Sequence, residues 1–94
     1  MEAHEIATVL EKEFGSQFSE GLGWRKFRVC LTSGPRDITT LAQSLAIQLM
    51  QQKRLETLRR IFDDGTIYAN GPAEDTKAKI LGNCKKLGVN IRQV

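Results

Sequence analysis

Apolar residues near the beginning of the chain recur at the spacing of an amphipathic helix. Between Glu2 and Phe14, this spacing places Ile6, Val9 and Leu10 on the same face as Phe14. Gly15 follows directly, and glycine adopts the left-handed conformation that ends many helices without a steric cost. The pattern therefore predicts a helix over residues 2–14.

The stretch from Asp37 to Gly65 holds the densest run of large apolar residues and is the predicted central element. Its first half carries a helical stripe formed by Ile38, Leu41, Ala42, Leu45 and Leu49. After a polar patch at residues 51–54, a second stripe with a shifted phase consists of Leu55, Leu58, Ile61 and Phe62. Either one long helix changes the face that it buries, or two helices meet near residues 50–53. Asp37 is the expected N-cap, because its carboxylate can accept hydrogen bonds from the first turn.

The segment from Trp24 to Leu31 alternates between apolar and polar positions. Phe27, Val29 and Leu31 fall on one side of an extended chain, and Lys26 falls on the other. A period of two is typical of a strand with one buried face, so the pattern predicts a strand here.

The last third of the chain predicts a strand, a helix and a second strand. Residues 66–69 and 89–94 are short strand-like runs, and residues 73–87 have helical spacing. Two strands joined by a helix favour a right-handed parallel crossover. The predicted fold is therefore α+β and forms a single compact domain over residues 1–94. We expect a small three-stranded sheet with at least one β-α-β crossover, and three to four helices packed mainly on one face.

The composition is that of one ordinary folded domain of 94 residues, 40% of them apolar and 27% charged. No apolar run approaches the ~20 residues of a membrane-spanning helix, and the N-terminal segment lacks the basic and apolar regions of a signal peptide. We therefore expect a cytoplasmic protein without a membrane partner. Cys30 and Cys84 lack metal-binding spacing and lie far from His4, the single histidine. We expect two buried thiols and neither a metal nor another cofactor.

The net charge of +3 is distributed unevenly along the chain. Residues 1–23 carry one lysine and five glutamates, whereas residues 24–60 carry eight lysines and arginines and only two acids. A basic middle segment can bind polyanions through their phosphates. It is equally compatible with an ordinary solvated surface.

Groups of residues with the spacing of a catalytic site are scarce. Asp63 and Asp64 are neighbours at an expected helix end, and His4 has no nucleophile nearby in sequence. The turn at residues 32–34 precedes a helix N-terminus, where an anion is favoured. However, the glycine patterns of nucleotide-binding loops are absent. We therefore expect a protein that is not an enzyme.

Basic residues form two candidate nucleic-acid-binding surfaces. On the predicted sheet, Trp24 and Tyr68 would share the uncovered face with basic side chains, which combines base stacking with phosphate contacts. A second basic cluster lies on the later half of the central stretch. The predicted nucleic-acid-binding residues are Trp24, Lys26, Arg28, Lys53, Arg54, Arg59, Arg60 and Arg92. The alternative for the first surface is that its basic residues have no binding role, because the uncovered face of any such sheet must be polar.

Part of the central stretch resembles a winged helix-turn-helix domain. In that family a helix with a Leu-Ala-x-x-Leu motif precedes a turn, a recognition helix and an Asp-Gly strand that opens the wing. The matching residues are Leu41, Ala42, Leu45, Asp64, Gly65 and Ile67. The resemblance implies that the basic cluster lies on or near a recognition helix. The match covers under a third of the chain, the spacing is longer, and Ala46 replaces the usual turn glycine, so the chain stays unassigned to that family.

The leading functional prediction is a non-enzymatic domain that binds DNA or RNA through the basic middle segment. The runner-up is a protein-interaction or oligomerisation module of an intracellular assembly, because an acidic head and a basic middle can complement each other between subunits. Apolar residues such as Ile47 and Met50 would contribute to such an interface.

Overall fold

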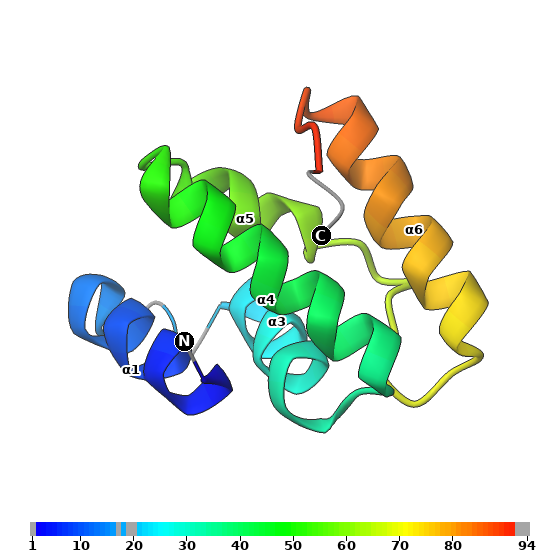
Figure 1. Cartoon of the computed structure of the whole chain (residues 1–94), viewed down its shortest axis with the longest axis horizontal. Helices are drawn as coiled ribbons and strands as arrows, with labels where there is room; N and C mark the ends of the chain where they lie inside the picture. The colour runs from blue at the N-terminus through cyan, green and yellow to red at the C-terminus, as the bar shows by residue number, and fades with distance from the viewer. Residues whose placement is uncertain (1, 17, 19–20, 92–94) are drawn as a thin grey trace.

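The computed structural model describes residues 2–16, 18 and 21–91, and the regular structure in these residues is entirely helical (Figure 1). The helices are α1 (Ala3–Phe14), α3 (Leu22–Ser33), α4 (Arg36–Gln51), α5 (Leu55–Ile61) and α6 (Ala73–Lys86). No strand occurs in the described part of the chain. The predicted α+β fold, with its three-stranded sheet and β-α-β crossover, is therefore wrong.

Helix α4 is the central element of the fold and packs against α1, α3, α5 and α6. Helices α1 and α6 lie on opposite sides of α4, and α3 lies behind it (Figure 1). An aromatic cluster fills the core beside α3 and α5, where the Trp24 ring lies 5.2 Å from Phe14 and 5.4 Å from Phe18. The cluster continues through Phe27 to Phe62, whose ring centroids are 5.1 Å apart. Most of the core thus forms around α4 and this cluster.

The segment predicted as the first strand is helix α3. Trp24, Phe27 and Leu31 are buried, at a spacing of three and four residues, whereas Val29 faces outward. Phe27 and Leu31 are four residues apart, a spacing that belongs to both the helical and the extended period. The helix is the more stable form because it buries the large Trp24 indole together with Phe27 and Leu31. A strand would have placed the indole on the face opposite these two residues.

The segments predicted as the second and third strands are loops. Residues 66–69 lie in a loop in which Ile67 and Ala69 are buried and Tyr68 projects outward. The predicted alternation of buried and exposed side chains is therefore present, but it belongs to a loop that packs on the core and not to a strand. Residues 89–91 follow α6 as coil, with Val89 buried, and residues 92–94 lie outside the described part of the chain. The strand that would open a wing is therefore missing, and the resemblance to a winged helix-turn-helix domain does not extend to the fold.

The central stretch consists of two helices rather than one. Helix α4 ends in a hydrogen-bonded turn in which Lys53 has a positive φ of 56°. The Lys53 and Arg54 N–H groups donate to the carbonyl oxygens of Met50 and Leu49, at 3.1 and 2.8 Å. This is the usual closing motif of a helix, although its left-handed position normally holds glycine. The predicted N-cap was wrong, because Pro35 holds that position and Asp37 lies in the first turn of α4.

The first and last predicted helices are confirmed within one or two residues. Helix α1 ends at Phe14 and is followed by Gly15, whose φ is 54°. Helix α6 ends in a second closing motif, in which Gly88 has a φ of 70° and the Val89 N–H donates to the Cys84 carbonyl at 2.8 Å. Both ends use glycine where the backbone requires a positive φ.

Candidate interaction surface

Three exposed large apolar side chains gather beside helix α3. Leu22 is 55% exposed, Val29 43% and Tyr68 63%. They line one groove of about 440 Å³ between α3 and the α5–α6 loop. We call it the α3 groove, and its lining residues are Leu22, Arg25, Lys26, Val29, Ile67, Tyr68, Ala69 and Asn70. A groove lined by several exposed apolar side chains is a candidate binding site.

The helical period of α3 explains one wall of the groove. Leu22, Arg25, Lys26 and Val29 are spaced at positions i, i+3, i+4 and i+7, so they share one face of the helix. The opposite face of α3 is turned to the core, where Trp24 is buried. The outer face therefore presents two aliphatic side chains with two cations between them.

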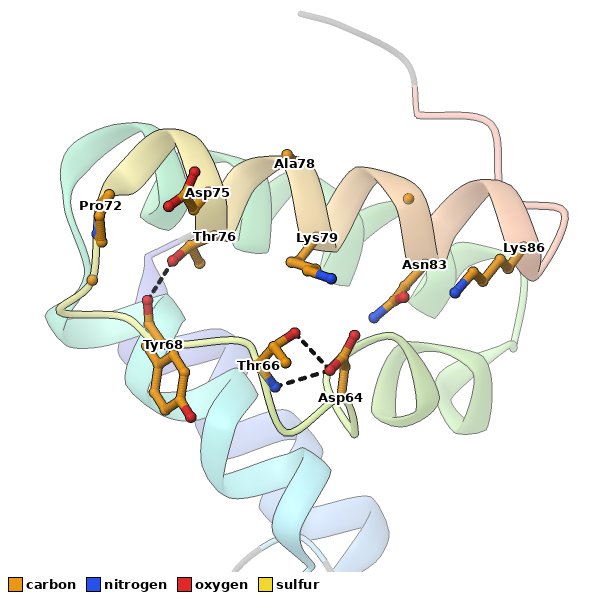
Figure 2. Close-up of a pocket in the computed structure, with 12 residues that line it drawn as sticks. Asp64, Thr66, Tyr68, Pro72, Asp75, Thr76, Ala78, Lys79, Asn83 and Lys86 are labelled. Atoms are coloured by element: carbon orange, nitrogen blue, oxygen red, sulfur yellow. Dashed lines mark hydrogen bonds between the residues drawn. The ribbon is translucent and has the colours of Figure 1, made fainter.

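The α5–α6 loop provides the other wall. The Thr76 hydroxyl donates to the Tyr68 carbonyl oxygen at 2.5 Å, which fixes the loop to the first turn of α6 (Figure 2). Ile67 and Ala69 are buried on either side, so the phenol ring of Tyr68 is directed away from the core. An aromatic ring held on a fixed backbone is a favourable anchor for a binding partner.

The charge of the α3 groove is positive. Arg25 is exposed, and Lys26 is half-buried with its ammonium group donating to the Asp64 carbonyl oxygen at 2.5 Å. This bond ties α3 to the start of the loop. None of the residues that line the groove is acidic. The groove thus combines an apolar floor with a basic rim, in which Lys26 is already bonded to the loop.

A second, larger groove of about 590 Å³ lies between α6 and the α5–α6 loop (Figure 2). Lys79 and Asn83 project from α6 toward Asp64 (Figure 2). The Asp64 carboxylate accepts hydrogen bonds from the N–H and hydroxyl of Thr66, at 2.9 and 2.7 Å, and these bonds lower the pKa of Asp64. Asn83 donates to the Ile61 carbonyl at 2.8 Å. These bonds hold the loop in its own conformation and join α6 to the end of α5, so this groove is a weaker candidate for a binding site.

The predicted binding residues on α3 occupy different environments. Trp24 is 1% exposed, so its indole packs in the core and is not available for stacking with a base. The Arg28 guanidinium lies 5.0 Å from the centre of the Phe18 ring and is half-buried. Only Lys26 lines the α3 groove. The structure therefore does not bring these three residues together on one surface.

The predicted binding residues on and beside α5 are also divided. Arg59 pairs with both Glu56 and Asp63, and Arg54 donates to the Leu87 carbonyl oxygen at 3.3 Å. Lys53 and Arg60 are exposed, and in the described part of the chain neither forms an ion pair. Arg92 lies outside the described residues. Lys53 and Arg60 are thus the members of this group with free charges.

Leu22, Arg25 and Val29 were not predicted as site residues. The signal that identifies them is their helical spacing, which places them on one face of α3. The signal was missed because the segment was interpreted as a strand. Leu22 lies before the start of that strand, and Val29 would have pointed inward.

The cysteines and acidic residues form no chemical site in the described residues. Cys30 and Cys84 are buried free thiols, and burial raises the pKa of each to about 11. The prediction of two buried thiols is confirmed. No group of three or more histidine, cysteine or acidic side chains among the described residues is arranged to hold a metal ion.

Comparisons with protein-family models, with curated proteins and with solved structures found no match for this chain. Across the described residues, every helix is too short or too polar to cross a membrane. The case for function therefore rests on the surface itself.

Proposed function

We propose that this chain is a protein-interaction domain that binds its partner through the α3 groove. The observation that carries the proposal is the gathering of Leu22, Val29 and Tyr68 in one groove with a basic rim. Isolated exposed apolar residues are normal on a protein surface, whereas apolar side chains gathered in a groove mark a candidate binding site. The runner-up function from the sequence is thus the one that this geometry favours.

The apolar floor supplies the driving force for binding. Covering the exposed parts of Val29 and Tyr68 contributes about 1 kcal/mol each, because both side chains are already half in contact with the protein. Aromatic rings and arginines are enriched among the residues that dominate binding energy. The groove offers both types, in Tyr68 and Arg25.

The basic rim selects the kind of partner. Exposed charges around an apolar contact contribute little affinity, but they speed association with a partner of opposite charge and repel one of like charge. Arg25 and Lys26 therefore favour a partner segment with apolar side chains flanked by carboxylates. Water and salt screen these charges, so binding should weaken as ionic strength rises.

Amide chemical shifts measured during a titration test the proposal. The probe is a synthetic amphipathic peptide with leucines along one face and glutamates on both flanks. The largest shifts are expected at residues 22–29 and 67–70, because these segments form the two walls of the groove. A control peptide with lysines in place of the glutamates should bind more weakly. Shifts that are absent, or scattered over the whole molecule, would contradict the proposal.

Nucleic-acid binding is the second candidate function. Arg60 and Lys86 line one small cavity of about 180 Å³ between α5 and α6, and Lys53 is exposed at the end of α4. Fluorescence-anisotropy titrations with labelled DNA and RNA test this candidate. Salt-dependent binding that is weakened by Arg60→Glu would support it. No binding at micromolar protein and low salt would exclude it.

A further inference from the structure

Asn70 is exposed and lies with Gly71 in the turn that leads into helix α6 (Figure 1). Asparagine followed by glycine is the pair of residues most susceptible to spontaneous deamidation, because glycine has no side chain to hinder attack on the carboxamide. We propose that Asn70 deamidates in the folded protein and so places a carboxylate in the α3 groove, which Asn70 lines. This modification goes beyond the proposed function, because it requires only water and no binding partner.

The reaction is a cyclisation followed by hydrolysis. The backbone nitrogen of Gly71 attacks the side-chain carbonyl carbon of Asn70, so that a new C–N bond forms and the C–N bond of the carboxamide breaks. The Gly71 nitrogen loses its proton, and the carboxamide nitrogen leaves as ammonia. Water then opens the resulting succinimide at either of its two carbonyl carbons. The product at position 70 is therefore an aspartate or an isoaspartate.

The turn holds the attacking nitrogen only weakly. The Gly71 N–H donates to the Tyr68 carbonyl oxygen at 3.4 Å, which is longer than the usual ~2.9–3.0 Å of such bonds. Asn70 lies outside the helices, and within the described part of the chain no hydrogen bond holds its carboxamide. The side chain can therefore turn toward the Gly71 nitrogen, a movement that a hydrogen-bonded position inside a helix would prevent.

The other two asparagines of the chain lack this combination. Asn83 lies inside α6, and its carboxamide donates to the Ile61 carbonyl oxygen at 2.8 Å. Asn90 is exposed, but Ile91 follows it, and a β-branched side chain hinders attack by its own backbone nitrogen. Deamidation is therefore expected at Asn70 before either of these positions.

Asp64 also precedes a glycine, but its side chain is a poor target for the same attack. The N–H and hydroxyl groups of Thr66 donate to the Asp64 carboxylate at 2.9 and 2.7 Å. These bonds lower the pKa of Asp64, and an ionised carboxylate resists nucleophilic attack far more than a neutral carboxamide does. Asn70 is therefore the more reactive of the two positions in this loop.

The product carboxylate changes the charge of the α3 groove. Arg25 and Lys26 line the groove, and no acidic residue lines it before the reaction. A carboxylate at position 70 adds a negative charge beside this basic rim, and it repels the acidic flanks of a partner. This effect on binding rests on the proposed function, whereas the reaction itself does not.

Incubation of the folded protein in heavy-oxygen water at neutral pH tests the proposal. Each new carboxylate takes an oxygen atom from that water, which separates the reaction from deamidation during later digestion in ordinary water. Trypsin places the three asparagines in separate peptides, residues 61–77, 80–85 and 87–92. Fragment masses then distinguish residue 70 from residue 64 within the first peptide.

Labelled aspartate and isoaspartate should accumulate at residue 70. Accumulation should be faster at higher pH, because the attacking nitrogen must lose its proton. The peptides that contain Asn83 and Asn90 should remain unlabelled over the same time. An absence of label at residue 70 in the folded protein, or equal labelling of all three peptides, would overturn the proposal.

The Gly71→Ala variant tests whether the glycine is the cause. A Cβ atom there would lie 3.5 Å from the Tyr68 Cβ and 3.7 Å from the Tyr68 carbonyl oxygen, and the φ of Gly71 is not positive. The variant should therefore keep the fold, which circular dichroism checks. Labelling at residue 70 should fall by at least roughly tenfold, because the methyl group hinders the approach of the nitrogen. An unchanged rate in the folded variant would overturn the proposed route.

The Asn70→Asp variant mimics the product and tests its effect on binding. Its affinity for the acidic amphipathic peptide should fall by roughly two- to fivefold, the effect of one exposed charge contact. Asn90→Asp is the matched control, since it makes the same charge change at an exposed position outside the groove. Equal affinities of the two variants would overturn the effect on the groove. A wild type that binds no peptide would refute the proposed function alone, because the labelling experiment needs no partner.

Discussion

Lys53 occupies a backbone conformation that its side chain does not favour. It has a φ of 56° at the end of α4, a position where a Cβ atom costs roughly 1 kcal/mol and where glycine is preferred. The cost is tolerated because the turn completes the hydrogen bonds of α4 and starts α5 at the right angle.

Replacing Lys53 with glycine should stabilise the fold. The expected gain in the free energy of unfolding is up to about 0.5 kcal/mol, because relief of the strained φ exceeds the cost of the greater freedom of glycine in the unfolded chain. Urea denaturation measures it. The neighbouring Gln52→Gly variant is the control, since Gln52 has an ordinary helical φ of −86° and the change there should destabilise. A loss of stability in Lys53→Gly would contradict this account.

The two cysteines should react slowly while the protein is folded. Burial raises the pKa of Cys30 and Cys84 to about 11 from an ordinary value of 9.0. At pH 8 the thiolate fraction is then roughly a hundredfold lower than in the unfolded chain, and the thiolate is the reactive form. Iodoacetamide labelling followed by mass spectrometry should detect little reaction in buffer and complete reaction in urea. Fast labelling of both thiols in buffer would show that the core is open.

At the scale of elements, helix α3 approaches α5 closely at Gly23. A Cβ atom on Gly23 would lie 2.5 Å from the Arg59 carbonyl oxygen and 3.0 Å from the Arg59 Cγ. A Cβ atom at this position would therefore clash with the backbone of Arg59 as well as with its flexible side chain. The contact positions α3, and with it the wall of the α3 groove.

Gly23→Ala should therefore destabilise the protein by about 1–3 kcal/mol, although alanine normally stabilises a helix more than glycine does. Gly82→Ala in α6 is the matched control, because no atom lies within 4 Å of the site of its Cβ. That substitution should stabilise by up to about 1 kcal/mol. Thermal denaturation of both variants compares them, and equal shifts in the same direction would argue against a close contact at Gly23.

The elements that the sequence predicts well are those with a single consistent period. Helices α1 and α6 combine helical spacing with a glycine just beyond the last turn. Helix α3 was mispredicted because its pattern was judged from only eight residues. In that run Phe27 and Leu31 fall on one face whether the segment is a helix or a strand. The loop at residues 66–69 was mispredicted because burial of Ile67 and Ala69 imitates a strand. In both cases the packing of neighbouring helices, which the local pattern does not contain, decides the structure.

At the scale of the whole molecule, the candidate site is built from segments far apart in sequence. Lys26 on α3 meets the loop through the Asp64 carbonyl, 38 positions further along the chain. Lys26 was predicted as a binding residue and lines the groove, whereas Trp24 was predicted on the surface and lies in the core. The basic character of the middle segment could be predicted from composition. The apolar floor of the groove could not, because it depends on how α3 and the loop pack together.

The most direct test of the central claim compares two matched substitutions. Val29→Asp places a carboxylate in the α3 groove, and Ile47→Asp places one on the exposed face of α4, where another aliphatic side chain reaches solvent. Calorimetric titration with the acidic amphipathic peptide measures the affinity of both variants and of the wild type. Val29→Asp should weaken binding by at least roughly tenfold, since it repels the peptide and removes apolar contact. Ile47→Asp should bind like the wild type. Equal affinities for all three proteins would contradict the assignment of the α3 groove as the binding surface.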